Sequence, residues 1–193
     1  MFKRKYDFKP DRTGTSLLNK LYLTKRQRLS ILKWLLYSLV LLVLSILQDV
    51  IFCQLTVRGA ATDLVSAAIL LLCIMLSTEN CAVFALISSV LFYFSGSAAG
   101  PYCILFLTGL GILLNVFRAG YLRKSFGSTF FCAAFALMVY QLALFVIGLF
   151  LGHTIPERFL SFCITGGLSL IAMPILYPIF LSIGKIGGES WKD

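Results

Sequence analysis

Apolar residues in this chain gather in six runs, which follow a polar stretch of about 33 residues and are separated by short polar segments. A helix that crosses a membrane needs about 20 mostly apolar residues, and the second and third runs are short by this measure. The pattern predicts six membrane-spanning helices, with four spans plus a hairpin as the alternative. The runs cover about residues 34–52, 63–76, 81–94, 101–117, 127–151 and 159–183.

The composition excludes a water-soluble domain. Of the 193 residues, 59% are hydrophobic and 13% are charged, and the mean hydropathy is +0.92. Soluble domains are about 45–50% apolar and about 25% charged. We therefore predict an all-α integral membrane protein, a compact bundle of about six transmembrane helices formed by residues 34–184.

The net charge of +9 arises almost entirely in residues 1–33, which hold ten of the seventeen cations and only two acids. With the amino terminus in the cytoplasm, fifteen cations fall inside and two, Arg58 and Arg158, fall outside. This satisfies the positive-inside rule, so we expect both termini in the cytoplasm. Residues 1–33 then form a basic arm, compatible with an interfacial helix over 16–33, and residues 185–193 form a short tail. Next to an apolar helix, such an arm favours anionic lipid over nucleic acid as its partner.

The sequence carries none of the common catalytic motifs. The six cysteines form no Cys-x-x-Cys pair and His153 is the only histidine, so neither a zinc site nor a disulfide framework is expected. The chain contains no His-Glu-x-x-His and no Gly-x-Ser-x-Gly motif. The Ser95–Gly100 segment lacks the lysine of a phosphate-binding loop. We expect no enzyme, no catalytic residue, no metal and no cofactor.

Each polar residue within an apolar run is costly in a membrane and so needs a structural or functional role. Asp63 opens the second run, and its place favours a helix cap that complements the helix dipole. Asp49 is left open between a structural role and cation binding. Asn115 and Gln141 are expected to hydrogen-bond to neighbouring helices, and His153 to be a loop residue. Small residues that allow close helix packing recur at Ala82, Ala85, Ser89, Gly109, Gly111, Gly166, Gly167 and Ser169.

Three local features over about residues 40–150 carry a resemblance to a known protein family. The first run closes with Leu47-Gln48. A loop then leads through Gly59-Ala60-Ala61-Thr62-Asp63-Leu64, similar to the family's Gly-x-x-Pro-Asp-Leu, with Thr62 in place of the proline. Last, Ser95-Gly96-Ser97-Ala98-Ala99-Gly100 is similar to the family's Ser-Gly turn followed by a glycine.

These features resemble the bacterial rod shape-determining protein MreD family. The resemblance implies a non-enzymatic scaffold of the cell-elongation machinery in the bacterial cytoplasmic membrane. Such proteins bind the bitopic coiled-coil protein MreC and help couple MreB filaments, indirectly, to peptidoglycan synthases. The matched motifs suggest partner-binding residues at Gln48, Asp63, Gly96 and Gly100.

Two other functions stay open from the sequence. Substrate-binding subunits of energy-coupling-factor vitamin transporters are six-helix proteins of similar size. Against that function, the first run lacks closely spaced small residues for docking, and no convergent polar cluster is expected in the external loops. In the third interpretation the basic arm itself recruits anionic lipid or an acidic partner.

Overall fold

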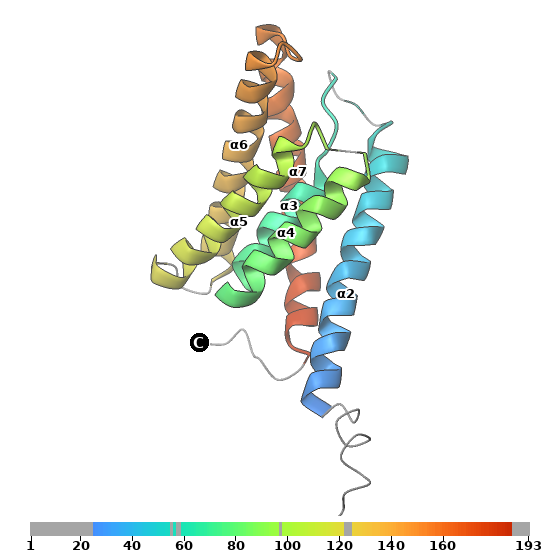
Figure 1. Cartoon of the computed structure of the whole chain (residues 1–193), viewed down its shortest axis with the longest axis vertical. Coiled ribbons are helices and arrows are strands. Elements are labelled where there is room, and N and C mark those ends of the chain that lie inside the picture. The colour runs from blue at the N-terminus through green and yellow to red at the C-terminus, as the bar shows by residue number, and fades with distance from the viewer. Residues whose placement is uncertain (1–24, 55, 57–58, 97, 122–124, 187–193) are drawn as a thin grey trace, which may run out of the picture.

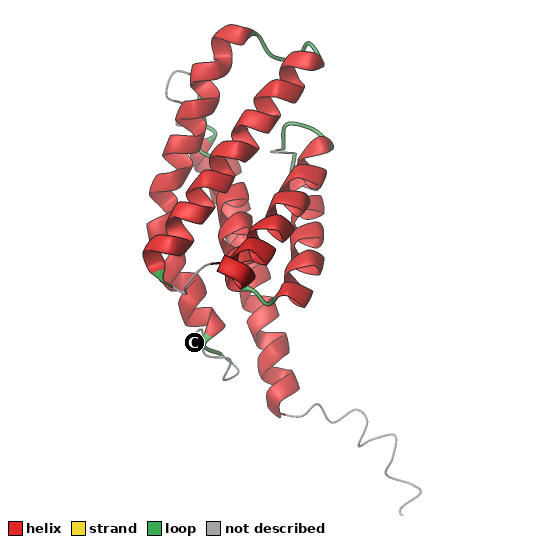
Figure 2. Cartoon of the chain, turned by 90° about the vertical axis from the view of Figure 1, so that its left-hand side faces the viewer, coloured by secondary structure: helices red, strands yellow, loops and turns green. Residues whose placement is uncertain are grey.

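The computed structural model describes residues 25–54, 56, 59–96, 98–121 and 125–186, and these residues form helices joined by loops (Figures 1 and 2). Two short elements flank the α-helices: η1, a π-helical turn at Gln48–Phe52, and η2, a 3-10 turn at Pro156–Arg158. The α-helices are α2 (Lys25–Leu47), α3 (Leu64–Met75), α4 (Thr78–Phe94), α5 (Tyr102–Tyr121), α6 (Phe126–Phe150) and α7 (Phe159–Gly184).

The predicted count of six helices is confirmed, and the helix bounds lie close to those predicted except at the amino terminus. There α2 begins at Lys25 and runs without a break into the first span, while residues 1–24 of the predicted arm lie outside the described residues. Four helical segments are long and apolar enough to cross a membrane: Gln27–Phe52, Tyr102–Tyr121, Phe126–Phe150 and Pro156–Gly184. Helices α3 and α4 are shorter, as expected for the second and third runs.

Helix α3 lies at the centre of the bundle, and the other five α-helices all pack against it. Its first eleven residues, Leu64 to Ile74, are buried. The segment is apolar on every side, which is typical of a helix enclosed by others. At 12 residues, and about 1.5 Å of rise per residue, α3 is about 18 Å long. It therefore falls well short of the roughly 30 Å hydrocarbon core of a bilayer.

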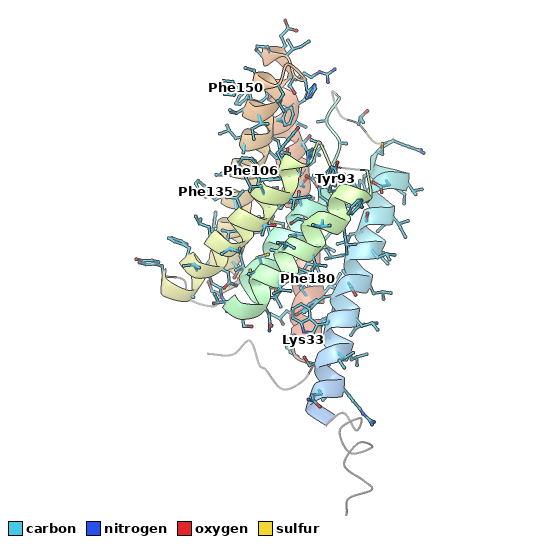
Figure 3. The ribbon with its side chains drawn as sticks, in the orientation of Figure 1. Lys33, Tyr93, Phe106, Phe135, Phe150 and Phe180 are labelled. Atoms are coloured by element: carbon cyan, nitrogen blue, oxygen red, sulfur yellow. The ribbon has the colours of Figure 1, made fainter. Side chains whose placement is uncertain are left out.

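The outer surface of the bundle is apolar. Phe135 and Phe150 point away from the bundle and are 72% and 84% exposed (Figure 3). Phe180, on α7, is fully buried and packs edge-on against Tyr37 of α2. Exposed apolar residues line each of the five outer helices. A surface of this kind is compatible with lipid as the surrounding solvent, because single exposed apolar residues are normal in water but continuous apolar faces are not.

Two glycines mark places where helices approach closely. A Cβ atom at Gly111 would lie 2.8 Å from the Cys73 sulfur and 3.4 Å from the Ala85 Cβ. One at Gly166 would lie 2.9 Å from the Met138 sulfur. Helix α5 thus packs closely on α3 and α4 at Gly111, and α7 packs on α6 at Gly166, where a larger residue would require the flexible Met138 side chain to move. Close packing at these two predicted positions is confirmed.

The bundle has two distinct ends. Helix α2 begins and α7 ends at the same end (Figures 1 and 2), which we call the arm end. The opposite end carries the segment between η1 and α3, the α4–α5 turn and the α6–α7 connection, and we call it the Asp63 end. Membrane insertion and the side of the membrane that each end faces stay predictions.

Candidate functional site

The start of α3 is capped by two side chains. The carboxylate of Asp63 accepts a hydrogen bond from the Ser66 backbone nitrogen at 3.2 Å, so the predicted cap is confirmed. The side-chain oxygen of Gln48, from η1, accepts from the Val65 nitrogen at 3.0 Å. The first N–H groups of a helix have no partner within the helix. Two of them are satisfied here although the site lies inside the bundle.

Two further helices contribute to the same cap. The Gln141 amide, on α6, donates to the second carboxylate oxygen of Asp63 at 3.2 Å. The Asp63 backbone nitrogen donates to the Ser169 hydroxyl, on α7, at 2.7 Å. Gln141 and Ser169 are buried. Because buried polar groups gain most from full pairing, this network fixes η1, α6 and α7 against the start of α3. The prediction that Gln141 bonds to a neighbouring element is confirmed.

A cavity of about 270 Å³ opens next to this network. It lies at the start of α3, beside α6 and α7, which extend further toward the Asp63 end (Figure 1). Irregular backbone at membrane depth is tolerated only where protein covers it or where it lines a water-filled cavity, and the Gly59–Asp63 segment lines this one. The cavity walls come from five places in the chain and include Gln48, Asp63, Phe92, Gln141, Arg158 and Phe162.

Charge and polarity differ along the cavity wall. Asp63 is half-buried at the start of α3, whereas Arg158, in η2, is exposed. Thr62 is the one residue among those described whose side chain has a buried polar atom, its hydroxyl oxygen, without a hydrogen-bond partner. The cavity thus combines a recessed carboxylate and an exposed guanidinium with aromatic side chains.

Of the four site residues predicted from the sequence, two line the cavity and two lie in the loop beside it. Gln48 and Asp63 come together, since both cap α3 and both line the cavity. Gly96 and Gly100 are not among the lining residues, but Ala98 and Ala99 between them are. Gly96 has φ +82°, a conformation that favours glycine. Gly100 stands against the Tyr102 ring, where a Cβ would come within 2.5 Å of a ring carbon. Both glycines therefore shape the loop that forms this part of the wall.

The polar groups that meet at this site come mainly from helical elements, so the expectation that the external loops hold no convergent polar cluster stays a prediction. Gln48, Asp63, Gln141 and Ser169 converge from four elements, although each stands alone in its own part of the sequence. The site roles of Thr62, Tyr140, Arg158 and Ser169 were missed. Thr62 and Arg158 lie at the ends of predicted spans, and this position is a usable signal, whereas Tyr140 and Ser169 lie near the middle of theirs and carry no local signal.

Other candidate residues lie apart from the cavity. Asp49 is exposed on η1, and the predicted loop position of His153 is confirmed. Among the described residues, no group of three or more His, Cys, Asp or Glu side chains could hold a metal ion.

The far end of α3 has its own cap. The Asn115 amide, on α5, donates to the carbonyl oxygens of Cys73 and Leu76, and the second of these distances is 2.8 Å. The Arg118 guanidinium also donates to Leu76 at 3.2 Å. The predicted interhelical bonding of Asn115 is confirmed. Both ends of the central helix are therefore satisfied by side chains of its neighbours.

No family model, curated protein or solved structure matches this chain.

Proposed function

We propose that this chain is a non-enzymatic membrane scaffold of the bacterial cell-elongation machinery, a divergent relative of the MreD family. In this proposal it binds an MreC-like bitopic partner in the cytoplasmic membrane. Through that partner it supports cell shape and peptidoglycan synthesis, with MreB and the wall synthases as indirect partners.

One observation carries the proposal: the three sequence segments that resemble the family form a single structural unit. Gln48 caps the helix that Asp63 begins, and Ala98 and Ala99 line the same cavity as both residues. Similarities at three separate places in a sequence gain weight when the residues lie together in space. The unit occupies the Asp63 end, which the proposal places outside the cytoplasm, where a bitopic partner presents its main domain.

A partner helix would bind this bundle by packing and polar contact. In lipid, apolar helices have no hydrophobic drive to associate, so close packing and interhelical hydrogen bonds decide the affinity. Asp63 influences the outer surface indirectly. Its hydrogen bonds with Gln141 on α6 and Ser169 on α7 fix the positions of these two helices at this end. We propose that a partner's single helix docks on a surface whose shape depends on this network.

The test is co-purification of the tagged full chain with its MreC-like partner from native membranes. We expect Asp63→Ala to reduce partner recovery by about tenfold, the equivalent of about 1.4 kcal/mol of binding free energy, with normal amounts of the chain in the membrane. Asp49→Ala is the matched control, since Asp49 is an exposed carboxylate in η1 at the same end, and it should retain the partner. Equal recovery with both variants contradicts the proposal.

The cavity favours a second candidate, the substrate-binding subunit of an energy-coupling-factor transporter. A concave site with a few convergent polar groups is the usual form of a small-molecule site. The first span still lacks the small-residue docking pattern, which leaves this candidate second. The same extraction separates the two functions: paired ATPases with a coupling subunit support a transporter, and a coiled-coil bitopic protein with wall synthases supports the scaffold.

A further inference from the structure

A second, smaller cavity lies toward the arm end of the bundle. It has a volume of about 70 Å³ and is lined by three parts of the chain: α2, the turn between α3 and α4, and the segment that follows α7. We propose that this cavity, which we call the arm-end pocket, binds the phosphate group of an anionic phospholipid. The proposal does not depend on the scaffold function. The polar and aromatic residues that line the pocket are Ser30, Lys33, Trp34, Ser77 and Asn80.

Lys33 supplies the positive charge of the pocket. It is half-buried on α2 (Figure 3), and Ser30 lines the same wall one helical turn earlier. An ammonium group carries three donors and no acceptor, so it can contact an anion and a group of this chain at the same time. Hydrogen bonds from an ammonium group to a phosphate are about twice as strong as neutral ones. The pocket therefore favours an anion over a neutral group.

The turn between α3 and α4 supplies neutral donors. The Asn80 amide donates to the Ser77 hydroxyl at 3.0 Å, and both side chains line the pocket. An amide nitrogen carries two hydrogens and a hydroxyl carries one, so this pair has donors beyond the bond between them. Ser77 makes no side-chain capping bond to α4, and the first N–H groups of a helix have no partner within it. The helix start thus adds the positive end of its dipole to the pocket.

Two neighbouring features carry negative character. The carbonyl end of α3 lies at the pocket, but the Leu76 carbonyl already accepts from Asn115 and Arg118. The sequence also places one acidic residue, Glu79, in the turn from Ser77 to Asn80. The start of α4 alone is therefore a weak anion site, and binding depends on the charge of Lys33.

The size of the pocket suits a phosphate group. A water molecule occupies about 30 Å³ of the liquid, so a cavity of about 70 Å³ holds a small group and not a whole metabolite. A lipid meets this limit, because its phosphate alone would enter the pocket while the rest of the molecule stays outside.

The position of the pocket indicates a lipid as the source of the phosphate. It lies where the polar stretch of the sequence ends and the first apolar run begins, at Lys33 and Trp34. Tryptophan is enriched at the membrane surface, and basic pockets between membrane helices on the cytoplasmic side bind lipid headgroups. Leu32 and Leu35, on the same part of α2, are exposed. Acyl chains can therefore lie along α2 while the phosphate occupies the pocket.

The test titrates the purified full chain in detergent with dioleoyl phosphatidylglycerol, dioleoyl phosphatidylcholine or inorganic phosphate. Calorimetry measures the affinities, and native mass spectrometry counts the lipids that stay bound. We expect saturable binding of phosphatidylglycerol, at least about tenfold tighter than phosphatidylcholine, whose choline group cancels the phosphate charge. Inorganic phosphate, which has no acyl chain, should also bind at least about tenfold more weakly. Equal affinity for inorganic phosphate and phosphatidylglycerol would overturn a lipid as the source.

Two variants test the pocket itself. Lys33→Gln should weaken phosphatidylglycerol binding by about tenfold, because it removes the charge-assisted bonds. Ser77→Phe places a ring at the pocket without changing the charge or removing a capping bond, and it should weaken binding as well. Thermal unfolding without lipid checks that each variant is folded, and Ser77→Phe carries the test if Lys33→Gln is not.

Arg28→Gln is the matched control. Arg28 is exposed on the same helix and is not one of the described residues that line the pocket. Because an exposed charge contributes little, this variant should bind phosphatidylglycerol within about twofold of the unaltered protein. Equal losses in Lys33→Gln and Arg28→Gln would show attraction to basic charge in general and overturn the pocket. Unchanged binding in Lys33→Gln and Ser77→Phe would overturn it too.

Discussion

The side chain of Asn115 shows how a single residue holds this fold together. It is 1% exposed and donates two hydrogen bonds to backbone carbonyls at the end of α3. Those carbonyls have no helical partner because α3 stops after 12 residues. The side chain thus compensates for the shortness of the central helix, and its loss removes the donor to the buried Cys73 carbonyl, while Leu76 keeps its bond from Arg118.

We therefore expect Asn115→Ala to lower the free energy of unfolding by about 1–3 kcal/mol, the cost of leaving a buried polar group unsatisfied. Asn80→Ala is the matched control at the same end, since Asn80 is exposed and bonds only to the Ser77 hydroxyl. That change should stay within about 0.5 kcal/mol. Denaturant unfolding of the purified protein in detergent measures both values. Equal stability of the two variants would show that the Asn115 bonds contribute little.

Sequence reasoning reached part of this residue-scale description. It predicted that Asp63 caps a helix and that Asn115 and Gln141 bond to their neighbours, because a polar group in lipid must find a partner. It did not predict which partners. Asn115 bonds to α3 across 39 and 42 residues, and Gln141 bonds to Asp63 across 78. No local pattern encodes such pairs, since they depend on how the helices are arranged.

At the scale of elements, α3 determines the packing of the bundle. Because every face of it is covered, its neighbours must approach closely, and α5 does so through Gly111. The helix bounds could be predicted because runs of apolar residues end at clear polar turns. The π-helical turn Gln48–Phe52 could not be predicted from the sequence. The apolar run is interrupted there only by Gln48 and Asp49, and the bond that positions Gln48 involves a residue 17 positions away.

Gly111 and Gly109 form a matched pair for testing this packing. A Cβ at Gly111 meets the Cys73 sulfur at 2.8 Å, whereas a Cβ at Gly109, two residues earlier, meets nothing within 4 Å. We expect Gly111→Ala to destabilise the protein by about 1–3 kcal/mol through overpacking. Gly109→Ala should be neutral or stabilising by up to about 1 kcal/mol, because alanine favours a helix.

Thermal unfolding of both glycine variants in the same detergent measures the difference. Gly111→Ala should unfold at the lower temperature. If the two variants unfold together, or if Gly109→Ala is the less stable, then α5 does not depend on the missing side chain to approach α3.

At the scale of the whole molecule, the cations are distributed unevenly between the two ends. Arg28 and Lys33 lie in the first half of α2 and Lys185 follows α7, toward the arm end, whereas Arg158 lies in η2 at the Asp63 end. The same imbalance in the sequence predicts that the arm end faces the cytoplasm. With this orientation the cavity opens on the outer side, where both the docking of a bitopic partner and the capture of a metabolite would take place. The orientation therefore bears on every function proposed above.

Single-cysteine labelling in intact cells tests this orientation. Cys53 is exposed at the Asp63 end, and Lys185 is exposed at the arm end. In chains stripped of the other cysteines, a membrane-impermeant maleimide should label Cys53 directly, because the positive-inside rule places that end outside. It should label a Lys185→Cys variant only after the membrane is permeabilised. The opposite pattern would place the cavity in the cytoplasm, where a bitopic partner's external domain has no access to it.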